Sequence, residues 1–449
     1  MQVVIYTSGH TILAQASGGM AIMTKDSLRN RRERALGSGA ELFYDEPLEI
    51  VRGEGAYLFD ADGRRYVDMY NNVPAVGHAN PAVVKAMAEQ QATLNTHSRY
   101  LHRGIVTFAE RLTALNHDGI ESAVFSCSGT EANEVAIQIA RLITRKRGLV
   151  CTDAAYHGNS EVVDSMSYIG LSPSRSGEVR SFPFPERYRP FKEGLSDEEL
   201  CDAYLERVAA AIKSLNSDGP GFAALIICSI FANEGVPVVP TGFMHKVTQL
   251  VHREGGLVIA DEVQSGYGRT GLWWGYECLD FRPDIVVTGK PMGNGLPLGA
   301  TATKKEYIDK FRSDKDYFNT CAATPLQAAV GMAVLDEIER LDLLRNSAEV
   351  GARLLNGLRE RIDRYEEVGD ARGLGLFLSV EMVRDSHSKE PDRDLALYLS
   401  DRLKEKGFLV SYSGKYENVL KIRPPLVFSH ADAEGFIVAF DECMEELHA

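Results

Sequence analysis

Two motifs that follow apolar runs carry the residue types needed for amine chemistry. Asp261 follows the apolar run 256–260 and opens the string Asp-Glu-Val-Gln-Ser-Gly-Tyr-Gly-Arg-Thr-Gly, and Lys290 follows the apolar run 284–288 in a glycine-rich segment. Open α/β sheets bind ligands at the carboxyl ends of their strands. An aspartate there could keep a pyridine nitrogen protonated and make the ring an electron sink. Burial favours the neutral form of lysine, which forms a Schiff base.

Each residue also has a simpler interpretation. Asp261 could be a salt-bridged carboxylate at a strand end, and Lys290 could be an exposed loop lysine. The eleven-residue string, and the place of Lys290 one strand after it, favour the chemical interpretation. Within the string, Val263 could pack on the face of a ring and Gln264 could reach a phenolic oxygen of that ring.

A small-residue turn could hold a phosphate group. Ser128, Gly129 and Thr130 separate the predicted strand 123–125 from a predicted amphipathic helix over 131–146. The first turn of a helix presents backbone N–H groups and the positive end of the helix dipole, which suits an anion. The alternative is a plain helix cap, in which Thr130 accepts a hydrogen bond from the first turn.

An aromatic residue follows the next predicted strand, at 149–151. Tyr156 could lie over a planar ring, and Gly158, two residues on, would allow close approach of the backbone. A loop with an ordinary buried tyrosine is the alternative interpretation. His157 lies between these two residues.

The elements that position these motifs alternate along the chain. Apolar runs separated by helix-like stretches predict parallel strands covered on both faces. A hairpin before this region, and a helix and two strands after it, predict a smaller α+β domain formed by both chain ends. We therefore expect an α/β fold with a large domain built on a mostly parallel sheet. The ranges behind this expectation are strands at 222–228, 256–260 and 284–288, a hairpin at 57–68, a helix at 325–340, and strands near 375–383 and 419–423.

The predicted division of the chain has four parts. Residues 1–35 are expected to form a flexible N-terminal extension, and 36–75 the first part of the small domain. Residues 76–325 are expected to form the large domain, and 326–449 the rest of the small domain.

Composition excludes several function classes. The net charge of −14 over 449 residues argues against non-specific nucleic-acid binding. No apolar run reaches the roughly 20 residues that span a bilayer, and the first 22 residues lack a signal-peptide pattern. The 7 cysteines are scattered without a Cys-x-x-Cys pair, which indicates reduced thiols and no metal site, as is typical of a cytoplasmic protein.

The four motifs, in this order, resemble those of class III aminotransferases, which are pyridoxal 5′-phosphate enzymes of fold type I. The resemblance runs from about residue 40 to the C-terminus. It implies that Lys290 carries the cofactor as a Schiff base and acts as a base, and that Asp261 pairs with the ring nitrogen. The other cofactor-binding residues that it implies are Ser128, Gly129, Thr130, Tyr156, His157, Val263, Gln264 and Thr320.

The resemblance also implies partners and a substrate class. Thr320 matches a threonine that reaches the phosphate of the neighbouring subunit's cofactor, which implies a homodimer with shared active sites. Arg372 matches an arginine that commonly receives a substrate carboxylate, although a surface arginine in a turn is the alternative. The substrate is expected to be a small amine, with Arg99 as a second candidate contact.

Segments 70–73, 94–102, 289–295 and 418–421 resemble the ethanolamine-phosphate phospho-lyases within the family. That resemblance implies elimination of phosphate from O-phosphoethanolamine or a similar amino phosphate. Aminotransferase action on a primary amine or ω-amino acid is the alternative.

A phospho-lyase needs cations beside the leaving phosphate. The candidates are Arg99, Arg103, Arg372 and Lys421. The chain departs from the family in having Cys228 where glutamate is usual, Leu296 where the phospho-lyases tend to have histidine, and the sequence Cys-Ala-Ala-Thr-Pro at 321–325 where Phe-Gly-Gly-Asn-Pro is usual. The change at Cys228 removes a charge near the cofactor site, and the other departures alter the lining of the pocket, so they concern the identity of the substrate and not the use of the cofactor. A catalytically idle regulatory module is the competing class, but the chain lacks the basic DNA-binding segment of such regulators.

Overall fold

The structure is a computed structural model that describes residues 4–7, 10–13, 26–167 and 177–449. It divides into two compact units, residues 1–48 and 49–449. The first unit contains the antiparallel pair β1 (Val4–Thr7) and β2 (His10–Leu13) and the helix α1 (Asp26–Leu36). Much of the predicted extension, at 1–3, 8–9 and 14–25, lies outside the described residues.

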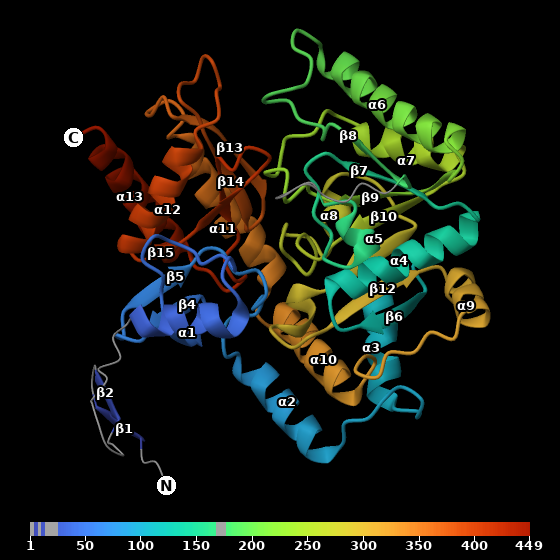
Figure 1. The fold of residues 1–449 in the computed structure, drawn as a ribbon, viewed down its shortest axis with the longest axis horizontal. Coiled ribbons are helices and arrows are strands. Elements are labelled where there is room, and N and C mark those ends of the chain that lie inside the picture. The colour runs from blue at the N-terminus through green and yellow to red at the C-terminus, as the bar shows by residue number, and fades with distance from the viewer. Residues whose placement is uncertain (1–3, 8–9, 14–25, 168–176) are drawn as a thin grey trace. The chain divides into compact units, whose positions relative to one another are not determined.

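The second unit is built on a seven-stranded sheet, whose strand order is β6-β12-β11-β10-β9-β7-β8 (Figure 1). Only β12 runs antiparallel to its neighbours. The predicted mostly parallel sheet is therefore confirmed. Its strands are β6 (Ser122–Ser126), β7 (Gly148–Thr152), β8 (Val179–Phe182), β9 (Phe222–Cys228), β10 (Leu257–Asp261), β11 (Ile285–Thr288) and β12 (Gly299–Thr303).

Both faces of this sheet are covered, which explains the continuous apolar runs. Side chains alternate between the faces of a strand. In β9, Ala224 and Ile226 belong to the core cluster that includes α4, while Leu225 and Ile227 join the cluster that includes α6 and α7. Figure 1 shows α4 crossing β12 and β6. The covering helices are α4 (Gly129–Thr144), α6 (Asp197–Ser217), α7 (Phe243–Arg253) and α9 (Lys305–Asp314).

The two ends of this unit meet in a smaller α+β part, as expected. Strand β15 from the C-terminal region pairs in parallel with β5 from the N-terminal region, with Phe408 opposite Val67 (Figure 1). One small sheet has the order β15-β5-β4-β3 and the other β13-β14-β17-β16. Their strands are β3 (Ile50–Glu54), β4 (Tyr57–Asp60), β5 (Arg65–Asp68), β13 (Val368–Leu374), β14 (Phe377–Met382), β15 (Phe408–Leu409), β16 (Ser411–Ser413) and β17 (Val419–Ile422).

The remaining helices frame these sheets. They are α2 (Pro81–Thr93), α3 (Arg103–Ala114), α5 (Glu161–Asp164), α8 (Gly275–Cys278), the 3₁₀ turn η1 (Lys290–Gly293), α10 (Pro325–Arg340), α11 (Leu343–Arg359), α12 (Arg393–Glu405) and α13 (His430–Leu447). In the described part of the chain, no helix is both long enough and apolar enough to cross a bilayer.

One strand differs from expectation. Arg372 lies in β13, which pairs antiparallel with β14, and its side chain is 3% exposed. The alternative of a surface arginine in a turn is therefore wrong. The segment Val-Gly-Asp-Ala-Arg-Gly-Leu has no apolar alternation that would predict a strand. Its polar side chains are tolerated because they pair inside the fold, as Arg372 does with Glu381.

Candidate active site

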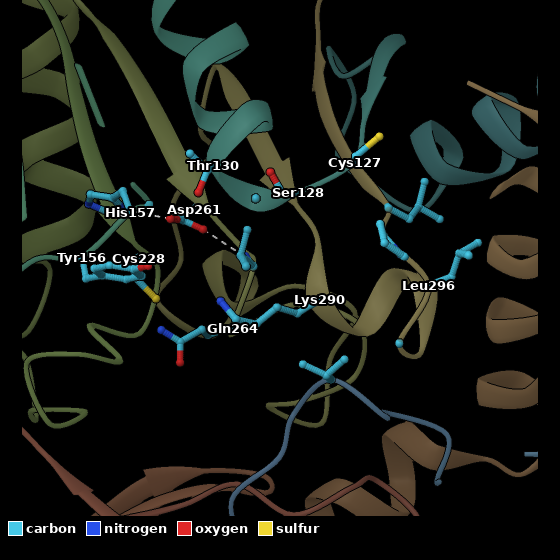
Figure 2. A pocket seen from close by; sticks show the side chains of 17 residues that line it. Cys127, Ser128, Thr130, Tyr156, His157, Cys228, Asp261, Gln264, Lys290 and Leu296 are labelled. Atoms are coloured by element: carbon cyan, nitrogen blue, oxygen red, sulfur yellow. Dashed lines mark hydrogen bonds and ion pairs between the residues drawn. The ribbon is translucent and has the colours of Figure 1, made fainter. Parts of the chain in front are cut away.

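The four motifs come together around one cavity of about 320 Å³. That volume lies within the range of about 300–1,000 Å³ usual for small-molecule sites. Figure 2 shows the Lys290 side chain extending into the space that Ser128, Thr130 and Asp261 also line. The predicted residues among its lining are Ser128, Gly129, Thr130, Tyr156, His157, Asp261, Val263, Gln264 and Lys290.

Asp261 is held rigidly at the end of β10. Its Oδ2 lies 2.8 Å from His157 Nδ1 and accepts a hydrogen bond of 3.0 Å from Asn133 Nδ2, while its Oδ1 accepts one of 3.1 Å from the backbone N–H of Val263. The residue is 5% exposed. These partners fix the position of the carboxylate. Asp261 therefore places a carboxylate in a fixed position on the cavity wall.

Lys290 opens the turn η1 directly after β11, beside Asp261's strand in the sheet. Its backbone has φ of 28°, a left-handed value that costs free energy for a residue with a side chain and is often retained at functional sites. Burial lowers the pKa of its amine below the ordinary value, and the nearby Arg423 lowers it further, while Asp261 opposes the change. The environment thus favours the nucleophilic, neutral amine.

The N-terminus of α4 forms an open cradle on the other side of the cavity. The Ser128 side chain, not that of Thr130, caps the helix by accepting from the backbone N–H of Glu131 at 3.2 Å. The first N–H groups of a helix have no partners within it, so they can bind an anion. A Cβ atom on Gly129 would lie 2.8 Å from Val263 Cγ2. Only glycine therefore lets the helix start approach the string that begins at Asp261.

A network of hydrogen-bonded polar side chains forms another wall of the cavity. Asn233, in the turn after β9, accepts from Gln264 Nε2 at 3.1 Å and from Lys421 Nζ at 3.2 Å. Its own Nδ2 donates to the backbone oxygen of Tyr156 at 3.1 Å. Arg423 donates to Gln264 Oε1 and to the backbone oxygen of Tyr70, and its guanidinium lies 4.4 Å from the centre of the Tyr70 ring.

Sequence reasoning missed three members of this site: Asn133, Asn233 and Arg423. Asn233 lies five residues after the end of the buried strand β9, beyond the mostly apolar segment 229–232, so its signal is weaker than that of Asp261, which ends its own strand. Asn133 is a fully buried polar residue inside α4. The amphipathic pattern that predicts this helix does not indicate a role for a single buried polar residue in it. Arg423 gave no signal beyond its proximity to the predicted strand at 419–423.

Five predicted residues do not line this cavity: Arg99, Arg103, Thr320, Arg372 and Lys421. Arg103 is exposed at the start of α3, and Lys421 is buried and donates to Asn233. Arg372 is buried in ion pairs of 2.6 Å with Glu381 and 3.1 Å with Asp370, so its guanidinium is already occupied. Arg99 is exposed, and its guanidinium lies 4.2 Å from the centre of the Phe318 ring. Thr320 is also exposed, in the segment before α10. The structure thus brings together the residues predicted around the cofactor ring, but not Thr320 or the three candidate arginines.

Comparisons with known proteins identify the family of this chain. The model of the family "Aminotransferase class-III" matches residues 43–444. The chain belongs to the class III aminotransferase family. Pyridoxal 5′-phosphate is the cofactor of this family, and the chain is an enzyme of fold type I. The idle regulatory module considered above is therefore excluded.

Relatives within the class III family differ in the reactions for which they are named. A phospholyase from Arthrobacter, solved in complex with phosphoethanolamine, has a TM-score of 0.90 and is 38% identical, covering 93% of this chain and 99% of that one. An ethanolamine-phosphate phospho-lyase homolog 1 from Caenorhabditis elegans is 32% identical, covering 94% of each chain. An alanine–glyoxylate aminotransferase 2-like protein from Drosophila melanogaster is 36% identical, covering 94% of this chain and 87% of that one.

The cavity of this class III enzyme has the donors and charges that pyridoxal phosphate requires. In such a cavity, the backbone N–H groups at the α4 N-terminus would hold its phosphate, and the Asp261 carboxylate would face its ring nitrogen. Lys290, whose amine has a lowered pKa, would bind its aldehyde. Two buried polar atoms beside Asp261, His157 Nε2 and Asn133 Oδ1, have no hydrogen-bond partner among the described residues.

Proposed function

We propose that this class III enzyme is a phospho-lyase that acts on O-phosphoethanolamine or a similar amino phosphate. With one water consumed, the reaction releases an aldehyde, ammonia and inorganic phosphate. The observation that carries the proposal is a pair of buried basic side chains, Lys421 and Arg423, which are 4% and 8% exposed. Among the described residues, neither forms an ion pair with a carboxylate. Both adjoin the cavity through Asn233 and Gln264.

Uncompensated buried cations are costly, so their presence calls for an anion that arrives with the ligand. In low-dielectric surroundings, positive charge acts on a nearby anion more strongly than it would in water. A phosphate on the β-carbon of an amine substrate supplies such an anion. Stabilising that phosphate as it departs lowers the barrier to elimination.

The chain's residues divide the work of the proposed reaction. Lys290 would hold the cofactor through its neutral amine and, once the substrate amine has displaced it, would accept the α-proton of that substrate. Asp261, held by His157 and Asn133, maintains a negative charge at the cavity wall. When bound, pyridoxal phosphate supplies the electron sink for the charge left on the α-carbon. Lys421 and Arg423 provide positive charge for the leaving phosphate.

Release of inorganic phosphate tests this proposal. The purified protein, supplied with pyridoxal phosphate, is incubated with O-phosphoethanolamine, and free phosphate and aldehyde are assayed together. We expect both products in equal amounts. Absence of phosphate release, combined with rapid transfer of the amino group to a keto acid, would instead establish the second candidate. That candidate is an aminotransferase for a primary amine or ω-amino acid, which the relationship to the Drosophila melanogaster protein favours.

Anion binding at this site should weaken as pH rises. Burial lowers the pKa of Lys421 well below its ordinary value, and Arg423 and Lys290 lower it further, while Cys228 and Glu234 oppose this. A bound anion favours the ammonium form and raises that pKa again. The affinity for the anion is therefore constant at pH values below the pKa that Lys421 has in the anion-free enzyme. It falls by about tenfold per pH unit between that pKa and the higher pKa that Lys421 has when the anion is bound.

Inhibition by sulfate measures this effect, because the charge of sulfate is constant over the neutral and alkaline range. We expect its inhibition constant to increase with pH in the native enzyme. The Lys421→Met variant should bind sulfate weakly with little pH dependence, because it lacks the titrating group. If the sulfate inhibition constant changes with pH in the same way in both proteins, Lys421 is not the group whose titration causes the pH dependence.

We also propose a homodimer with shared active sites. Thr320 and Arg99 lie outside their own chain's cavity and are exposed, so they are free to serve the cavity of a second copy. Exposed large apolar side chains, among them Tyr100, Leu101 and Val106, adjoin Arg99 in sequence and suit an interface. Sedimentation should give twice the mass of one chain, and Leu101→Asp should weaken the association. A monomer of full activity would contradict the shared site.

A further inference from the structure

The amide of Asn233 is the centre of the polar wall beside the cavity. The side chain lies in the turn that follows β9, and the residue is 8% exposed. Its Oδ1 accepts from both Gln264 Nε2 and Lys421 Nζ, and its Nδ2 donates to the backbone of Tyr156. The neutral side chain of Asn233 thus connects Gln264 and Tyr156, which line the cavity, to the buried Lys421.

The carboxylates near this wall are engaged elsewhere. Glu234 accepts hydrogen bonds from Thr152 Oγ1 and, at 3.1 Å, from the backbone N–H of Asn233. Asp261 is occupied by His157 and Asn133. Among the described residues, the Lys421 ammonium has Asn233 Oδ1 as its hydrogen-bond acceptor and no carboxylate within ion-pair distance.

This arrangement has an electrostatic consequence. An amide oxygen can orient an ammonium group without cancelling its charge, whereas a carboxylate of the same shape would neutralise it. Asparagine and aspartate differ here by one charge at nearly identical volume. The residue at position 233 therefore sets how much positive charge faces a ligand in the cavity.

We propose that Asn233 determines the specificity of this site for amines that carry a second, anionic group. It holds Gln264 and Lys421 in place and, being neutral, leaves the charge of Lys421 and Arg423 available to the ligand. This inference rests on the proposed function in its choice of a phosphate as the anionic group. A carboxylate at position 233 would remove the preference and spare the amine-binding half of the site.

The test compares two ligands that differ only in the phosphate, O-phosphoethanolamine and ethanolamine. Binding to the cofactor-loaded enzyme is followed through the visible absorbance of the cofactor, in stopped flow where turnover is fast. We expect Asn233→Asp to weaken O-phosphoethanolamine binding by about tenfold or more, because an added charge lies next to Lys421. Ethanolamine binding should change by less than about threefold, the range expected without a charge partner.

A matched control is Asn356→Asp, which adds the same charge at an exposed position on α11. It should alter neither affinity. If Asn233→Asp weakens the binding of both ligands equally, the role of Asn233 is purely structural. If neither affinity changes, position 233 does not face the anion. Either result overturns the proposal. If the variant folds poorly, Lys421→Met carries the same test, with the same selective loss for O-phosphoethanolamine expected.

The two proposals can fail separately. Ligand affinities do not depend on phosphate release, so a selective effect of Asn233→Asp supports the specificity role even if no phosphate is liberated. Phosphate release with no ligand-selective effect in either variant would uphold the lyase and reject the role of Asn233.

Discussion

Replacing Lys290 with alanine should reduce turnover by at least about 10⁴-fold, because one side chain serves as both nucleophile and general base. The geometry behind this expectation is the amine of lowered pKa in the cavity, beside the strand that carries Asp261. Turnover is measured with whichever amine substrate proves active. A small primary amine added to the solution should restore part of the rate, since it can enter the space that the side chain leaves.

The matched control is Lys305→Ala. Lys305 lies at the start of α9 with its side chain 65% exposed and paired with Asp309. Exposed pairs of this kind contribute little to stability, so this variant should keep full activity. A Lys290→Ala enzyme with near-native turnover would refute the assignment of Lys290, whatever the substrate.

Replacing Asp261 with asparagine should reduce turnover on the order of 10³-fold, comparable to the loss of a preorganised electrostatic partner. The amide has the same shape but no charge, so the protonated ring nitrogen loses its stabilising anion. Asn133 would also face an amide instead of a carboxylate across the 3.0 Å contact. Steady-state rates, together with the visible absorbance of the bound cofactor, report the loss.

Asp261→Glu separates charge from position. It keeps the anion but moves it by one methylene, so it should be less active than the native enzyme and more active than Asp261→Asn. Asp314→Asn, at an exposed position on α9, controls for the loss of one negative charge and should have no effect. If Asp261→Asn retains most of the native rate, the carboxylate does not control the chemistry.

Much of this site could be predicted from local sequence, because each motif follows an apolar strand. β9 coincides with the predicted strand 222–228, and α10 with the predicted helix 325–340. Parallel strands bring their carboxyl ends to one edge of the sheet, so Asp261 and Lys290 had to lie close together. The prediction that these two residues meet therefore needed no knowledge of contacts between distant parts of the chain.

The unpredicted residues depend on contacts that local patterns do not contain. Asn233 is 188 positions from Lys421, and the two meet only when the fold brings β17 beside the turn that follows β9. Arg372 was expected to receive a substrate group, but the hairpin of β13 and β14 places Glu381 against it. A charged residue's partner is set by tertiary structure, so a motif alone does not say whether an arginine is available.

Reduction of the cofactor-loaded enzyme with borohydride, followed by peptide mapping by mass spectrometry, tests the central claim most directly. Hydride converts the link between the cofactor and its lysine into a stable amine, so the label marks the residue that carries the cofactor. We expect the added mass on the peptide that contains Lys290. Its appearance on the neighbouring Lys421, or on no lysine at all, would contradict the site described above.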